Sequence, residues 1–127
     1  MSVYAINKLC HDALHDLTFR EALKRDPAAA IGSGSFSLEI GGPKIPPGER
    51  ACTPDPEWAK HVQALMEAAR IDDLVEEATF PRLMQAGNIG GELLNWVAML
   101  GVIGARKPRF IKPQIAQGHA YGVWRWN

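Results

Sequence analysis

The hydrophobic pattern at the start of the chain predicts short helices. Apolar residues recur there at three- and four-residue spacing, which places them on one face of an amphipathic helix. Thr18 and Glu21 have the spacing of a capping box and predict the start of a second helix. Asp26 and Pro27 suit the cap and the first residue of one more helical turn, over 28–31. The chain is therefore predicted to open with a compact helical cluster.

The segment 32–53 interrupts the helical pattern with glycine, serine and proline. Phe36, Leu38 and Ile40 alternate there with polar residues and suit one short extended piece, for which the pattern indicates no partner strand. Loops longer than about 12–15 residues in compact domains are mostly lids, binding loops or linkers. The sequence leaves open whether this loop is a lid or a plain connector.

Helical patterns return in the middle of the chain. Prolines and acids at 53–57 suit the first turn of a helix. A further short helix is predicted over 72–78. A new helical turn over 80–87 follows, because the proline at its second position fits a helix start and its final glycine a helix end.

The stretch 89–105 is the most apolar part of the chain. Glu92 and Asn95 are its only strongly polar residues, so it predicts a buried helix. It is shorter than the roughly 20 apolar residues that span a bilayer, and no membrane contact is predicted. A small domain can hardly cover every face of such a helix. Part of its surface is therefore expected to contact another chain.

The predicted fold class is all-α, a compact bundle of about five to six short helices. The helical domain covers 1–105 and includes the irregular loop at 32–53. Residues 106–127 are basic and aromatic and contain two prolines, which preclude an ordinary continuous helix. They are predicted to form an extended arm that either wraps over a partner or folds back on its own body.

The overall composition is typical of one globular domain. The chain has 127 residues, of which 46% are hydrophobic, and its formal net charge is zero. No acidic residue follows Glu92, so the tail is basic and the rest of the chain acidic. The basic, aromatic arm could bind single-stranded nucleic acid, but the neutral net charge and the pI of about 6.9 argue against this partner. The chain start does not have the pattern of a secretory signal, which indicates a cytoplasmic protein.

The residues that commonly bind metals have no convincing pattern. Cys10 and Cys52 lie far apart and predict free thiols rather than a disulfide or a zinc site. His11 and His15 have a spacing that can hold a metal, but solvated polar residues on the wet side of a helix explain them equally simply. We therefore predict no metal ligand and no catalytic residue in this chain.

The best polar constellation is formed by Asn88, Glu92 and Asn95, at helical spacing i, i+4 and i+7. A carboxylate in an apolar setting can act as an acid or a base, which would make a stand-alone enzyme conceivable. Glu92 can equally pair with Arg82 or with a lysine of the tail, and this structural interpretation is preferred.

Two segments resemble a known family. The sequences YAINKL at 4–9 and FREALKRDP at 19–27 resemble the opening of LigA-type small (α) subunits of LigAB-class extradiol dioxygenases, such as protocatechuate 4,5-dioxygenase. The segment FPRLMQAGN at 80–88, with the leucines at 93–94, resembles the region where a helix of that family ends in Gly-Asn before the last core helix.

The resemblance implies an all-helical, non-catalytic subunit of a cytoplasmic hetero-oligomer. Such a subunit holds no metal itself. It docks on a larger LigB-like subunit, which contains non-haem Fe(II) and cleaves a catecholic ring, and it helps to close the pocket around this small aromatic substrate. An alternative is a precursor or binding protein with a leader-like N-terminal helical domain, whose C-terminal arm is recognised or modified by a partner enzyme.

The expected contact residues follow from the cap that precedes the apolar helix and from the arm behind it. Substrate contacts are expected at the cap and its apolar surroundings, namely Gly87, Asn88, Glu92, Phe80 and Trp96. Partner contacts are expected on the apolar helix and the arm, namely Leu93, Val97, Leu100, Trp124 and Trp126.

Overall fold

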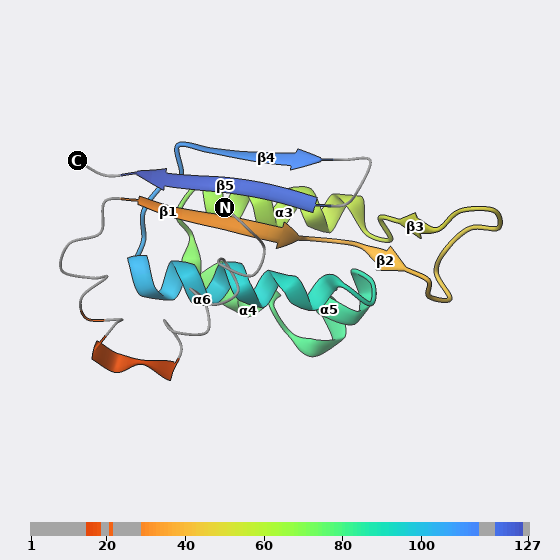
Figure 1. Cartoon of the computed structure of the whole chain (residues 1–127), viewed down its shortest axis with the longest axis horizontal. Coiled ribbons are helices and arrows are strands. Elements are labelled where there is room, and N and C mark those ends of the chain that lie inside the picture. Colours follow the sequence, from red (N-terminus) through yellow and green to blue (C-terminus); the bar gives the residue numbers. More distant parts are fainter. Residues whose placement is uncertain (1–14, 19–20, 22–28, 115–118, 126–127) are drawn as a thin grey trace.

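The structure, a computed structural model, is a mixed α/β fold and not the predicted all-α bundle (Figure 1). It describes residues 15–18, 21, 29–114 and 119–125. Most of the predicted N-terminal helical cluster, together with Cys10, His11 and Trp126, lies outside this part of the chain.

A three-stranded antiparallel sheet forms one layer of the molecule, with the strand order β1-β5-β4. The two-stranded pair β2–β3 continues from the end of β1 and extends away from the main body (Figure 1). The strands are β1 (Ala29–Ser35), β2 (Glu39–Ile40), β3 (Ala51–Cys52), β4 (Phe110–Gln114) and β5 (His119–Arg125).

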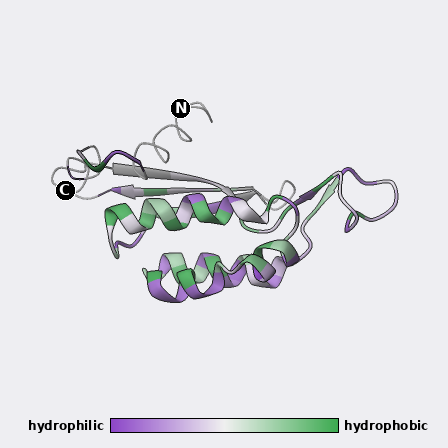
Figure 2. Cartoon of the chain, turned by 90° about the horizontal axis from the view of Figure 1, so that it is seen from below, coloured by the Kyte–Doolittle hydropathy of each residue, from purple (hydrophilic) through white to green (hydrophobic). Residues whose placement is uncertain are grey.

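The helices between residues 56 and 103 lie on one side of this sheet, as the edge-on view in Figure 2 shows. α6 packs directly against β1, and α4 packs against both α6 and α3. None of the described helices is long and apolar enough to cross a membrane. The helices are α3 (Pro56–Glu67), α4 (Ile71–Glu77), α5 (Phe80–Gln85), the 3-10 turn η1 (Gly90–Glu92) and α6 (Leu93–Ile103).

The prediction of an all-α fold is wrong because β1 and β5 pair across most of the chain. Ala29 lies opposite Arg125 and Ser35 opposite His119, in a register that no local pattern indicates. Residues 29–31, predicted as part of a helical turn, are the start of β1. Tertiary pairing here overrides a local preference that is weak in a run of alanine, glycine and serine.

The predicted C-terminal arm is the hairpin-like pair β4–β5 of the sheet. Of the two alternatives left open, it therefore folds back on its own body. Trp124 of β5 is completely buried and belongs to the same core as the helices. Its indole Nε1 donates a hydrogen bond of 2.9 Å to the backbone oxygen of Arg106, which fixes the entry to β4.

The centre of the core is Trp96 of α6, which is 1% exposed. Its ring contacts those of Phe36 and Trp124 at centroid distances of 5.1 and 6.0 Å. Gly32 and Gly122 lie opposite each other on β1 and β5, directly over this ring. A Cβ atom at Gly32 would be 2.6 Å from Trp96 Cζ3, and one at Gly122 would be 2.9 Å away. This glycine pair lets α6 approach the sheet closely enough to bury the indole.

Candidate functional site

The candidate residues at 86–92 lie along the segment 35–40, and the two stretches form a hydrogen-bonded seam. The amide of Ile89 donates to the Leu38 oxygen at 3.0 Å, and the Ser37 hydroxyl donates to the Ala86 oxygen at 2.9 Å. Ser37 and Leu38 lie between β1 and β2 and belong to neither strand. These bonds therefore satisfy backbone groups that would otherwise be buried without partners.

Gly87 is required at this seam for steric reasons. Its φ is 113°, in a region that favours glycine, and a Cβ atom there would collide with the Leu38 backbone oxygen. The predicted helix end at Gly87 is confirmed, because α5 stops at Gln85 and its cap is Ala86.

Asn88 holds the start of the β2–β3 pair. Its side-chain amide accepts a hydrogen bond from the Ile40 nitrogen at 2.9 Å and donates one to the Ile40 oxygen at 2.7 Å. Its backbone nitrogen donates to the buried Glu39 carboxylate at 2.6 Å. All three bonds are made within the chain, so Asn88 acts as a clamp on β2.

Glu92 accepts a hydrogen bond from the backbone nitrogen of Ser35, with an N–O distance of 2.6 Å. The bond joins the end of β1 to η1. Structural pairing of Glu92 is thus found, but its partner is a backbone amide and neither Arg82 nor a tail lysine. Arg82 instead lies 3.8 Å from the Glu77 carboxylate.

The two predicted apolar walls lie in different environments. Phe80 begins α5 and is 74% exposed, whereas Trp96 is buried in the core. Next to Glu92, the Trp96 Nε1 and the Ser35 hydroxyl are buried side-chain atoms without a hydrogen-bond partner in the part of the chain that the structure describes. Of the five substrate contacts proposed from the sequence, Gly87, Asn88 and Glu92 lie in the seam, Trp96 lies in the core and Phe80 lies on the surface.

The five residues predicted to contact a partner are mostly used in this chain's own core. Leu93, Leu100 and Trp124 are at most 1% exposed, and Val97 packs against the core while partly exposed. Trp126 lies outside the described residues. β1 covers the apolar helix on one side and α4 on another, while Leu94 of the same helix is 48% exposed.

A polar cluster that the sequence analysis missed joins α3, α4 and α5. The Glu77 carboxylate accepts a hydrogen bond from Trp58 Nε1 at 2.7 Å and lies 3.4 Å from His61 Nε2. The Arg82 guanidinium carbon lies 5.4 Å from the centre of the Trp58 ring. These residues come from three helices, so no spacing in the sequence could have indicated them. The His61 side chain is 52% exposed, so it lies on an open surface.

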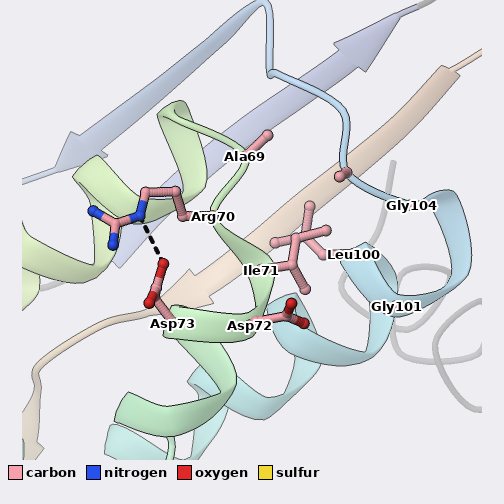
Figure 3. A pocket seen from close by; sticks show the side chains of 9 residues that line it. Ala69, Arg70, Ile71, Asp72, Asp73, Leu100, Gly101 and Gly104 are labelled. Atoms are coloured by element: carbon pink, nitrogen blue, oxygen red, sulfur yellow. Dashed lines mark hydrogen bonds and ion pairs between the residues drawn. The ribbon is translucent and has the colours of Figure 1, made fainter.

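A cavity of about 380 Å³ lies between the start of α4 and the end of α6 (Figure 3). The Asp72 side chain points toward α6, and Arg70 is turned away to pair with Asp73 at 2.6 Å. Of the residues predicted as contacts, only Leu100 lines it. The described residues contain no group of three histidine, cysteine or acidic side chains that could hold a metal ion, in this cavity or elsewhere.

Comparison of the chain with models of known families, with curated proteins and with solved structures found no match.

Proposed function

We propose that this protein is a non-catalytic subunit of a cytoplasmic hetero-oligomer, which docks on a larger catalytic subunit. Following the resemblance at 4–9, 19–27 and 80–88, the larger subunit is a LigB-like extradiol dioxygenase that cleaves a catecholic ring. The observation that carries the non-catalytic role is the seam itself. Its polar groups, Asn88 and Glu92 above all, are bonded to backbone atoms of the same chain rather than directed at a substrate.

The metal chemistry of this proposal belongs to the larger subunit. Non-haem iron needs several histidine and carboxylate ligands in one place. The described part of this chain does not bring three such groups together, and so does not fit the iron. Fe(II) would be bound by the partner, and no step of ring cleavage is assigned to residues of this chain.

Exposed apolar side chains at one end of the molecule support docking. Ile40, Phe80 and Met84 are 51%, 74% and 39% exposed. Phe80 and Met84 share one side of α5 at i, i+4 spacing, and Asn88 binds Ile40 to the turn that follows this helix. We call these three residues the α5 patch. Large apolar side chains gathered at one end of a small protein are typical of a surface that contacts another protein.

The alternative of a precursor with a modified C-terminal arm receives less support. Residues 119–125 form the central strand of the sheet, and Trp124 is completely buried. A modifying enzyme would have to unfold the core to reach Trp124, and of the described side chains of this strand only those on its outer side, such as Tyr121, are exposed.

Co-expression with the larger dioxygenase subunit tests the proposal. We expect the tagged chain to recover the larger subunit, to raise its ring-cleavage rate, and to show no turnover of catechols alone. Replacing Phe80 and Met84 by serine should weaken co-purification about tenfold or more, because buried aromatic and apolar anchors dominate interface energies. Val75→Ser, at a side chain on α4 that is 52% exposed, is the matched control.

Two results would contradict the proposal. Catechol cleavage by the pure chain would show that it is an enzyme. Failure of the unmodified chain to recover the larger subunit would show that the proposed hetero-oligomer does not form.

A further inference from the structure

The side of the sheet that faces away from the helices carries basic and aromatic side chains. Along β5, Ala120, Gly122 and Trp124 are buried, and the residues between them point to the opposite side. The same alternation on β4 buries Ile111. We call this opposite side the outer sheet face, formed by Phe110, Lys112, Tyr121, Val123 and Arg125.

The strand register brings the two aromatic rings of the outer sheet face close together. Phe110 lies opposite Val123, and Lys112 lies opposite Tyr121. Phe110 and Tyr121 are thus diagonal neighbours on adjacent strands, which corresponds to a separation of about 7–8 Å. Their exposed fractions are 53% and 43%. Two exposed rings at this separation can each stack on one of two successive unpaired bases.

The charge of the sheet has one sign. Strands β1, β4 and β5 contain no acidic residue, while Lys112 and Arg125 are exposed on the outer sheet face. The linker from α6 to β4 adds three exposed basic residues, Arg106, Lys107 and Arg109.

The acidic residues that balance these charges lie elsewhere. α3 and α4 carry most of the acidic residues of the helical layer, on the far side of the sheet from the outer face; these are Glu57, Glu67, Asp72, Asp73, Glu76 and Glu77. The neutral net charge, which argued against a nucleic-acid partner, is the sum over the whole chain and conceals a basic sheet beside an acidic helical layer. The local potential, and not the sum, determines what a surface attracts.

We propose that the outer sheet face binds single-stranded nucleic acid. Bases stack on Phe110 and Tyr121, and backbone phosphates contact Lys112, Arg125 and the basic residues of the linker. Unpaired bases are required because a duplex hides the base faces that the rings would contact. This inference goes beyond the proposed function and does not depend on it, since the α5 patch is a different surface.

Fluorescence anisotropy with the purified full chain tests the inference. The probes are fluorescein-labelled oligo(dT) and oligo(U) of fifteen nucleotides, with a duplex of the same length and a labelled polyglutamate as controls. We expect saturable binding of the single strands at 50 mM NaCl. If three or four basic residues contact phosphates, affinity should fall about 20- to 50-fold between 50 and 200 mM NaCl.

Variants separate stacking from charge and from folding. Tyr121→Leu and Phe110→Leu should each weaken binding about 5- to 100-fold, whereas Tyr121→Phe and Phe110→Tyr, which keep a ring, should retain it. Lys112→Gln should lower the slope of the logarithm of affinity against the logarithm of salt concentration by about 0.7. Lys60→Gln, at an exposed lysine of α3 that pairs with Glu57, is the charge-matched control and should bind like the unmodified chain.

Three results would overturn the inference. One is the absence of saturable binding at 50 mM NaCl. Another is equal affinity for the duplex, or binding that survives loss of both rings. The third is tighter binding of polyglutamate than of the single strands, which would identify the outer sheet face as a contact for an acidic protein.

Discussion

At the scale of single residues, the end of α3 shows a local conflict between sequence and backbone. Ala69 has a φ of 56°, in the left-handed region that normally takes glycine. Its amide bonds to the Met66 oxygen at 3.0 Å, and the Arg70 amide bonds to the Leu65 oxygen at 2.9 Å. This pair of bonds is the Schellman motif, in which glycine is the preferred residue at the position of Ala69.

Ala69→Gly should therefore stabilise the protein. Glycine adopts this φ without the steric cost of a Cβ atom, and we expect the free energy of unfolding to rise by about 0.5–1 kcal/mol. Urea denaturation followed by far-UV circular dichroism measures the change. Ala64→Gly, at an exposed position inside the same helix, is the control and should lower the free energy by about 1 kcal/mol. A loss of stability at both positions would contradict the explanation.

At the scale of elements, the seam between 35–40 and 86–92 determines where β1 ends and how β2–β3 is held. The Ser35 amide occupies one carboxylate oxygen of Glu92 with a charge-assisted hydrogen bond, which fixes the side chain against the end of β1. The seam thus explains why a polar constellation that suggests chemistry in the sequence serves folding in the structure.

Glu92→Ala should destabilise the protein by about 1–2 kcal/mol, because it leaves the partly buried Ser35 amide without its acceptor. Glu92→Gln keeps an acceptor oxygen and should cost less than about 1 kcal/mol. Urea denaturation of the two variants side by side checks the difference. Equal stability of Glu92→Ala and the unmodified chain would mean that the bond does not contribute.

At the scale of the whole molecule, the sheet joins the two ends of the described chain. β5 contributes Trp124 to the core that also contains Trp96 and Phe36. Ile111 of β4 and Trp124 of β5 therefore share one hydrophobic core with the helices, although the composition of their segment differs from that of the preceding residues.

A chain truncated after Ala105 should not fold. It lacks β4 and β5, which cover Trp96, and leaves β1 without its partner strand. Far-UV circular dichroism and urea denaturation should show no cooperative transition for the truncated chain. Full-length Trp124→Ala, which removes only the buried ring, should still fold but lose about 3–5 kcal/mol. A cooperative transition in the truncated chain would show that 1–105 is a domain of its own.

The helices of the middle of the chain could be predicted because their signals are local. α3 begins with prolines and an acidic first turn, and the Asp55 side chain accepts the Trp58 amide at 3.1 Å. α5 starts next to Pro81 and ends before Gly87. α6 could be recognised as buried from its apolar composition alone, since six of its residues are buried. Hydrophobic periodicity and capping residues act between positions that are close in the sequence, so helices that depend on them can be predicted from the sequence alone.

The sheet and the role of the candidate site depended on contacts between distant parts of the chain. Nothing near Gly32 or Gly122 in the sequence indicates why these positions are glycine. The close approach of the Trp96 ring explains it, because a Cβ atom at either position would collide with the ring. In the sequence, the helical spacing of Asn88 and Glu92 suggests a reactive site. In the structure, their side chains accept hydrogen bonds from the backbone amides of Ile40 and Ser35. The sequence by itself determined the helices between residues 56 and 103 and which residues are apolar or charged. The tertiary structure decided which of them pair, because strand pairing and burial are set by segments that lie far apart along the chain.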